Sequence, residues 1–203
     1  AGGKDVAVVK ALDRPQWQNI IGAPRTANVN FHTPFAQQKC GLGMMVTQDQ
    51  LGLLSNTYAD LRYAYRLKTS ETGVLSVGLQ ARIEYARFNW NKAKSISPTD
   101  NILQNENENL TKPNFGVGAY YKDKNFFFGF SVPQLLESTL YRSSYEDLPS
   151  LHRFRTYYLM TGAELALSPS VDFMPGVLVS YIANAPLQAE INANLVFSKT
   201  ILV

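Results

Sequence analysis

The sequence is poor in the residue types that most often carry chemistry. It contains one cysteine, Cys40, and two histidines, His32 and His152, far apart in the chain. A single cysteine excludes an intramolecular disulfide framework and a cysteine-based zinc cluster. Neither histidine has a cysteine or carboxylate at metal-ligand spacing, so we interpret both as ordinary polar residues. We therefore predict no catalytic residue, no metal and no cofactor.

Charged residues are also scarce, at 17% of the chain, against about 25% in typical globular proteins. The 19 Lys and Arg exceed the 16 Asp and Glu by only three, which is too small an excess to indicate a nucleic-acid partner. No run of about 18 apolar residues occurs, which excludes a transmembrane helix. Tyrosine and phenylalanine, by contrast, are abundant, with 11 residues each.

Polar and apolar residues alternate with a period of two over long segments. Between residues 56 and 67, Asp60, Arg62 and Arg66 fall on even positions, whereas Leu61 and Tyr63 fall on odd ones. Successive side chains of a strand leave it on opposite faces, so one face is charged and the other apolar. The same split recurs over residues 26–32, 74–85 and 187–197. The pattern predicts an all-β protein.

The spacing of these segments predicts ten strands and the start of an eleventh. We expect them near residues 5–12, 25–33, 40–49, 55–67, 73–89, 114–121, 125–131, 152–167, 171–183 and 187–197, with the last beginning at Thr200. We expect no helix, apart from a possible single turn over residues 133–138. The chain opens at Ala1 and stops in mid-strand at Val203, so we expect one β-barrel domain, 1–203, truncated at both ends.

Short and long links alternate along the chain. Short polar links fall at 34–39, 68–72, 122–124, 168–170 and 198–199. The links between them are mostly longer, at 13–24, 50–54, 90–113 and 131–151, and only 184–186 is short in this second group. In an antiparallel sheet the short links would gather at one end, as in outer-membrane barrels. Loops on a rigid scaffold carry recognition, so the segments 90–113 and 131–151 are the predicted binding surface.

Two architectures produce such alternation, a soluble β-sandwich and a membrane barrel. Several predicted strands span 12 to 17 residues, whereas globular strands cluster near about 5 to 6. A tilted strand that crosses a bilayer needs about 9 to 11. The apolar faces end in aromatic residues, as interfacial girdles do. We therefore predict an antiparallel transmembrane outer-membrane β-barrel, of which this chain covers about 11 strands as a fragment of a larger, even-numbered barrel, and keep the sandwich as the alternative.

In such a barrel the apolar positions meet lipid and the polar positions face the interior. Mixed charges favour a salt-bridged or plugged interior over a selective pore. The predicted lumen-facing polar residues are Asp60, Arg62, Arg66, Gln80, Arg82, Glu84, Gln188, Glu190, Asn192 and Asn194.

Short motifs, taken in order, resemble one protein family across nearly the whole chain. The motifs are Gln16-Trp17, Gly22-Ala23-Pro24-Arg25-Thr26, Phe31-His32-Thr33-Pro34, Gly41-Leu42-Gly43, residues 49–53, Tyr63-Ala64-Tyr65-Arg66, Pro113-Asn114-Phe115-Gly116-Val117-Gly118, Gly129-Phe130-Ser131-Val132-Pro133, Ala185-Pro186-Leu187-Gln188 and Asn192-Ala193-Asn194-Leu195. Their order and spacing resemble the PorP/SprF family of Bacteroidetes outer-membrane proteins.

The resemblance implies a non-enzymatic outer-membrane barrel of the type IX secretion system and, in gliding relatives, of the motility apparatus. It implies three kinds of partner: outer-membrane lipid, secreted proteins with a C-terminal sorting domain, and periplasmic components of the secretion or gliding apparatus. The alternative function is a channel for lipids or small solutes. A third, an outer-membrane enzyme, would need a serine, a histidine and an acid together at one rim.

Overall fold

The computed structural model describes residues 6–17, 19–36, 39–89, 108–141, 151–197 and 201–202, and these residues form an all-β structure. Its strands are β1 Val8–Pro15, β2 Arg25–Phe35, β3 Cys40–Leu51, β4 Leu54–Lys68, β5 Val74–Phe88, β6 Glu108–Lys122, β7 Phe126–Val132, β8 Ser138–Tyr141, β9 Leu151–Arg153, β10 Thr156–Ala163, β11 Leu165–Ser168, β12 Val171–Ile182, β13 Gln188–Phe197 and β14 Ile201–Leu202. None of the described residues belongs to a helix of the length and apolarity needed to span a membrane.

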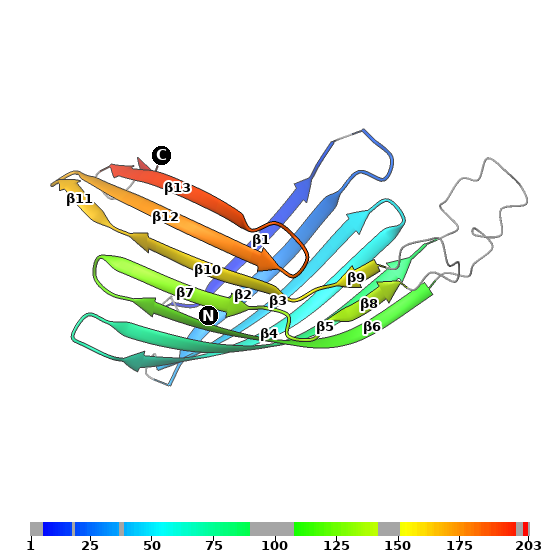
Figure 1. Cartoon of the computed structure of the whole chain (residues 1–203), viewed down its shortest axis with the longest axis horizontal. Coiled ribbons are helices and arrows are strands. Elements are labelled where there is room, and N and C mark those ends of the chain that lie inside the picture. Colours follow the sequence, from blue (N-terminus) through cyan, green and yellow to red (C-terminus); the bar gives the residue numbers. More distant parts are fainter. Residues whose placement is uncertain are drawn as a thin grey trace, which may run out of the picture.

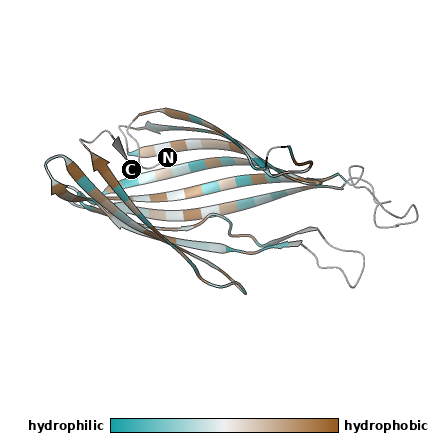
Figure 2. Ribbon diagram, turned by 90° about the horizontal axis from the view of Figure 1, so that it is seen from above, coloured by the Kyte–Doolittle hydropathy of each residue, from teal (hydrophilic) through white to brown (hydrophobic). Residues whose placement is uncertain are grey.

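One antiparallel sheet contains all strands except β8 and β9. Its path runs from β1 through β7 in sequence order and continues through β10, β12, β13 and β14, while β11 pairs with β12. The sheet is strongly curved (Figures 1 and 2). Within the described ranges β1 and β14 do not pair with each other, so the sheet is open there.

The predicted strands are confirmed, with three changes. β6 begins at Glu108 rather than near residue 114, because residues 108–113 pair with Ile83–Phe88 of β5. The predicted strand 152–167 is instead divided into β9, β10 and β11. The last break falls at Glu164, whose backbone N–H donates to the Asn125 carbonyl at 2.7 Å instead of joining the ladder.

The third change concerns residues 133–138, where the structure has no helical turn; β8 already begins at Ser138.

The links follow the predicted asymmetry with one exception. The link between β3 and β4 falls at the long-link end but is a two-residue turn, Gly52 and Leu53. Gly52 has a φ of +57° and donates its N–H to the Gly22 carbonyl at 3.0 Å. A two-residue hairpin turn needs a positive φ, which glycine adopts without strain. Most of the predicted link 90–113 and the link 198–199 lie outside the described residues.

At the other end of the sheet, a side-chain clamp joins two neighbouring short turns. The Thr72 hydroxyl, between β4 and β5, donates to the Asp123 carboxylate, between β6 and β7, at 2.6 Å. This bond and the backbone N–H of Lys124 hold the pKa of Asp123 below its usual value. The clamp fixes the spacing of the two turns.

Candidate functional site: a covered charge cluster

On β4 and β5, charged side chains are buried on one face and apolar side chains are exposed on the other. We call the face that carries Asp60 and Glu84 the polar face, and these residues are only 4% and 2% exposed. On the opposite, apolar face Leu61, Leu79 and Ile83 are 54%, 59% and 58% exposed. A soluble sheet buries its apolar side. Here the charged side is covered and the apolar side is open, with the two kinds alternating along each strand (Figure 2).

The register of β4 and β5 places opposite charges directly across from each other. Asp60 pairs with Arg82, and Arg62 pairs with Gln80. Arg82 donates from Nε and Nη2 to the two oxygens of Asp60, at 2.5 and 2.9 Å, and Arg62 donates to the same carboxylate at 3.1 Å. Arg62 also donates from Nε to Gln80 Oε1 at 2.9 Å. Asp60, whose side chain is fully covered, therefore holds two guanidinium groups in place.

The described residues between β7 and β10, 133–141 and 151–155, fold over this cluster, and we call them the covering segment. Their short β8–β9 hairpin lies beside β4, β5 and β6 in Figure 1. Arg153 places Nη2 2.8 Å from Glu84 Oε1, with the two side chains 18% and 3% exposed. The same nitrogen donates to the Tyr58 hydroxyl at 3.1 Å. Arg153 is thus the charged group by which the covering segment is paired to the sheet.

Tyr58 lies between two arginines from different elements. The guanidinium carbons of Arg82 and Arg153 are 5.0 and 5.4 Å from the centre of its ring. Both distances are within the range of cation–π attraction, which is stronger in a desolvated setting. The Gln134 amide, in the orientation that satisfies its neighbours, accepts from Arg82 and Arg153 at 3.0 and 3.2 Å.

Hydrogen bonds to β6 hold the start of the covering segment. The Asn114 amide donates to the Leu136 carbonyl at 2.8 Å and accepts from the Leu136 N–H at 3.1 Å. The Leu135 N–H donates to the Phe115 carbonyl at 2.8 Å. Arg155 donates twice to the Leu135 carbonyl, at 3.0 and 2.8 Å, which ties the two ends of the segment together. Backbone polar groups that leave the sheet are thereby satisfied.

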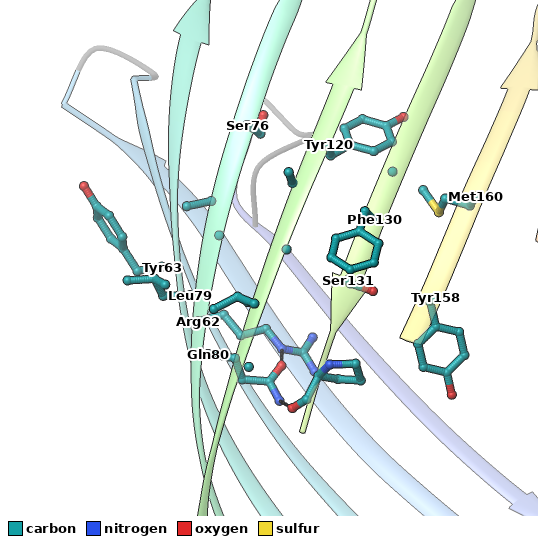
Figure 3. Close-up of a pocket in the computed structure, with 18 residues that line it drawn as sticks. Arg62, Tyr63, Ser76, Leu79, Gln80, Tyr120, Phe130, Ser131, Tyr158 and Met160 are labelled. Atoms are coloured by element: carbon teal, nitrogen blue, oxygen red, sulfur yellow. Dashed lines mark hydrogen bonds between the residues drawn. The ribbon is translucent and has the colours of Figure 1, made fainter. Parts of the chain in front are cut away.

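A pocket of about 470 Å³ lies on the polar face beside the charge cluster (Figure 3). Its floor is glycine-rich, with Gly78 of β5 and Gly116 and Gly118 of β6. Tyr120 and Met160 line it, and Arg62 and Gln80 lie at the opposite end of the view from Tyr120. This size falls in the range of about 300–1,000 Å³ that is typical of small-ligand sites.

The cross-strand register places all ten predicted interior residues on the polar face, because residues directly opposite each other share a face. The structure brings Asp60, Arg62, Gln80, Arg82 and Glu84 into one cluster. Arg66, farther along β4, is half-buried. In β13, Gln188, Glu190 and Asn192 are exposed and Asn194 is half-buried. That these residues line a closed lumen stays a prediction.

The sequence interpretation missed the residues that cover the cluster. Arg153, Gln134 and Asn114 were outside the predicted interior set, and 131–151 was expected to be an exterior binding loop. That expectation is wrong for the described start of the segment, where residues 133–136 pack on the polar face. Nothing in the alternation signals a loop that turns inward. The described residues contain no group of three or more histidines, cysteines or carboxylates suited to a metal ion.

Fold and site together define a class of protein. An antiparallel sheet with apolar side chains outside and paired charges inside is the arrangement of β-sheet membrane proteins. Residues 1–203 match the family described as Type IX secretion system membrane protein PorP/SprF, and the chain belongs to this family. It is therefore a membrane protein of the type IX secretion system. A search of curated proteins found no match to the chain.

Proposed function

We propose that the protein is a non-enzymatic outer-membrane barrel that receives or anchors a secreted surface protein through its C-terminal sorting domain. In this proposal the apolar face contacts outer-membrane lipid, and periplasmic components of the secretion or gliding apparatus bind at the opposite end from the cargo. The family match over residues 1–203 supports the assignment to the secretion system. The covered polar face supports an anchoring role over a transport role.

The observation that carries the proposal is the inward fold of the covering segment. It pairs Arg153 with Glu84 and seats Leu135 and Leu136 on β6. A sheet interior occupied in this way leaves its recognition to the exposed parts of the loops. On β9, the exposed His152 bonds to Thr139 of β8 at 3.1 Å. The β8–β9 hairpin thus offers a fixed surface for a protein partner.

Photo-crosslinking in cells tests this proposal. A benzophenone amino acid replaces His152 in one strain and Leu61, on the apolar face of β4, in a matched control strain. Both strains secrete a cargo with a C-terminal sorting domain. We expect a crosslink to the cargo from position 152 and none from position 61. Absence of the crosslink at 152, with the protein present in the outer-membrane fraction, would contradict a cargo site on this hairpin.

The alternative function, a channel for lipids or small solutes, predicts a continuous open passage along the polar face. The contacts of Arg153 and Asn114 place protein across that face instead. Planar-bilayer recording of the protein distinguishes the two functions. We expect no steady ion conductance from an anchoring barrel, whereas a channel would conduct without any change to the covering segment.

A further inference from the structure

The pocket on the polar face has an elongated, largely apolar lining. Along the strands it extends from the row of Arg62, Gln80 and Gly116 to the row of Ser76, Tyr120, Gly129 and Met160. These rows are four residues apart, which is about 13 Å at the usual rise of a strand. Such a shape fits an extended ligand better than a compact one.

The fold itself does not require glycine at every position of the pocket floor. At Gly116 an added Cβ would lie 2.7 Å from the Pro133 carbonyl, so the covering segment excludes a side chain there. At Gly78 the nearest atom to an added Cβ would be the Tyr63 carbonyl oxygen at 3.6 Å, an ordinary contact. The bare backbone at Gly78 is therefore open to close approach by a bound group.

Charge is unbalanced at one end of the pocket. Among the described residues, the ion pairs of the cluster join two carboxylates, Asp60 and Glu84, to three guanidinium groups, Arg62, Arg82 and Arg153, which is an excess of one positive charge. Of the three arginines, only Arg62 lines the pocket. Its Nε and Nη2 are engaged with Gln80, Asp60 and Met45, whereas Nη1 has no hydrogen bond within the described part of the chain.

We propose that this pocket binds a fatty acid, a single acyl chain with a carboxylate head group. The acyl chain lies along the open backbone at Gly78 and extends toward Tyr120 and Met160, and the carboxylate bonds to Arg62 at the charged end. A carboxylate supplies the negative charge that the cluster lacks, and charge-assisted bonds to a guanidinium are strong and directional. The proposal concerns a ligand site distinct from cargo anchoring and stands or falls separately from it.

The test uses the full chain purified in a non-ionic detergent and titrated with lauric acid or, as an uncharged match, methyl laurate. The chain has four methionines, so methyl NMR can follow Met160 in the pocket and Met44 on the apolar face as an internal control. We expect a saturable shift at Met160 with lauric acid and none at Met44. Parallel, non-saturating shifts at both would mean detergent-like partitioning and would overturn the proposal.

Four variants locate the ligand. Arg62→Gln should weaken lauric acid binding at least tenfold and leave methyl laurate unchanged. Arg66→Gln is the matched control, since Arg66 has the same strand and face but does not line the pocket; its effect should stay below threefold. Gly78→Leu should abolish the Met160 shift with both probes, and Gly78→Ala, which fits sterically, should weaken it. Unaltered binding in both Gly78 variants, or equal losses for acid and ester in Arg62→Gln, would refute the site.

Discussion

Asp60 is the residue on which the charge cluster depends. Its side chain is fully covered and lies within ion-pair distance of both Arg62 and Arg82. Burial of a carboxylate is costly unless it is paired and hydrogen-bonded. The two guanidinium groups meet that requirement, and Asp60 in turn holds Arg82 against the Tyr58 ring and Arg62 beside the pocket.

Replacement of Asp60 tests this dependence. Asp60→Asn keeps the shape but leaves two guanidinium groups without their counter-charge, so we expect a loss of about 3–5 kcal/mol in the free energy of unfolding. Urea unfolding in micelles measures this loss, and heat-modifiable migration on gels gives the folded fraction at each urea concentration. The control is Asp13→Asn, which breaks an exposed pair with Arg25 and should cause no measurable change. Equal losses of unfolding free energy at both positions would show that burial of the carboxylate does not determine the size of the loss.

At the scale of elements, the covering segment is the part of the chain that departs from the repeating hairpins. It leaves the sheet after β7 and returns at β10, so β7 and β10 are neighbours in the sheet although 23 residues separate them. Its attachment combines the backbone bond from Leu135 to Phe115, the bonds between the Asn114 side chain and the Leu136 backbone, and the ion pair of Arg153 with Glu84. Of these contacts, the ion pair is the one made by a charged side chain of the covering segment itself, and a substitution of Arg153 removes it.

Arg153→Met should release the hairpin from the polar face, because it leaves Glu84 covered without its cation. We expect a loss of about 3 kcal/mol in unfolding free energy and faster protease cleavage near β8 and β9. Glu84→Gln alone should also destabilise the protein. The loss of unfolding free energy in the double variant should be smaller, by at least about 1 kcal/mol, than the sum of the two single losses. The reason is that each single substitution leaves one buried charge without its partner. Strict additivity would contradict a direct pairing between them.

At the scale of the whole molecule, the outward face of the sheet is apolar along its length. Leu61 lies at the centre of β4 and pairs with Ala81 of β5, whereas Tyr85 lies near one end of the apolar face. Leu61 is 54% and Tyr85 40% exposed. A surface of this kind is stable only when hydrocarbon replaces water around it.

The cost of a charge on this face should therefore depend on depth. Leu61→Arg should destabilise the protein in bilayers by about 2–4 kcal/mol, and Tyr85→Arg, closer to the interface, by about 0–1 kcal/mol. The folded fraction in lipid vesicles at increasing urea concentration measures both. Equal costs at the two positions would contradict a bilayer centred on Leu61.

The alternation of polar and apolar residues determined the all-β class, the strand positions and the face on which each side chain lies. Asp60, Arg62, Gln80, Arg82 and Glu84 were all assigned to one face from the sequence. This was possible because the period of a strand is a local property: each side chain points away from its neighbour whatever the rest of the chain does.

Only the tertiary structure decided which of these residues meet and what covers them. The pairing of Asp60 with Arg82 depends on register, and the contacts of Arg153 with Glu84 and Tyr58 join residues 69 and 95 positions apart. Such contacts are set by how the curved sheet folds around its own loop, and no periodicity encodes them. The sequence therefore determined which side chains face the interior and which face outward, and the tertiary structure determined which of the interior side chains contact one another.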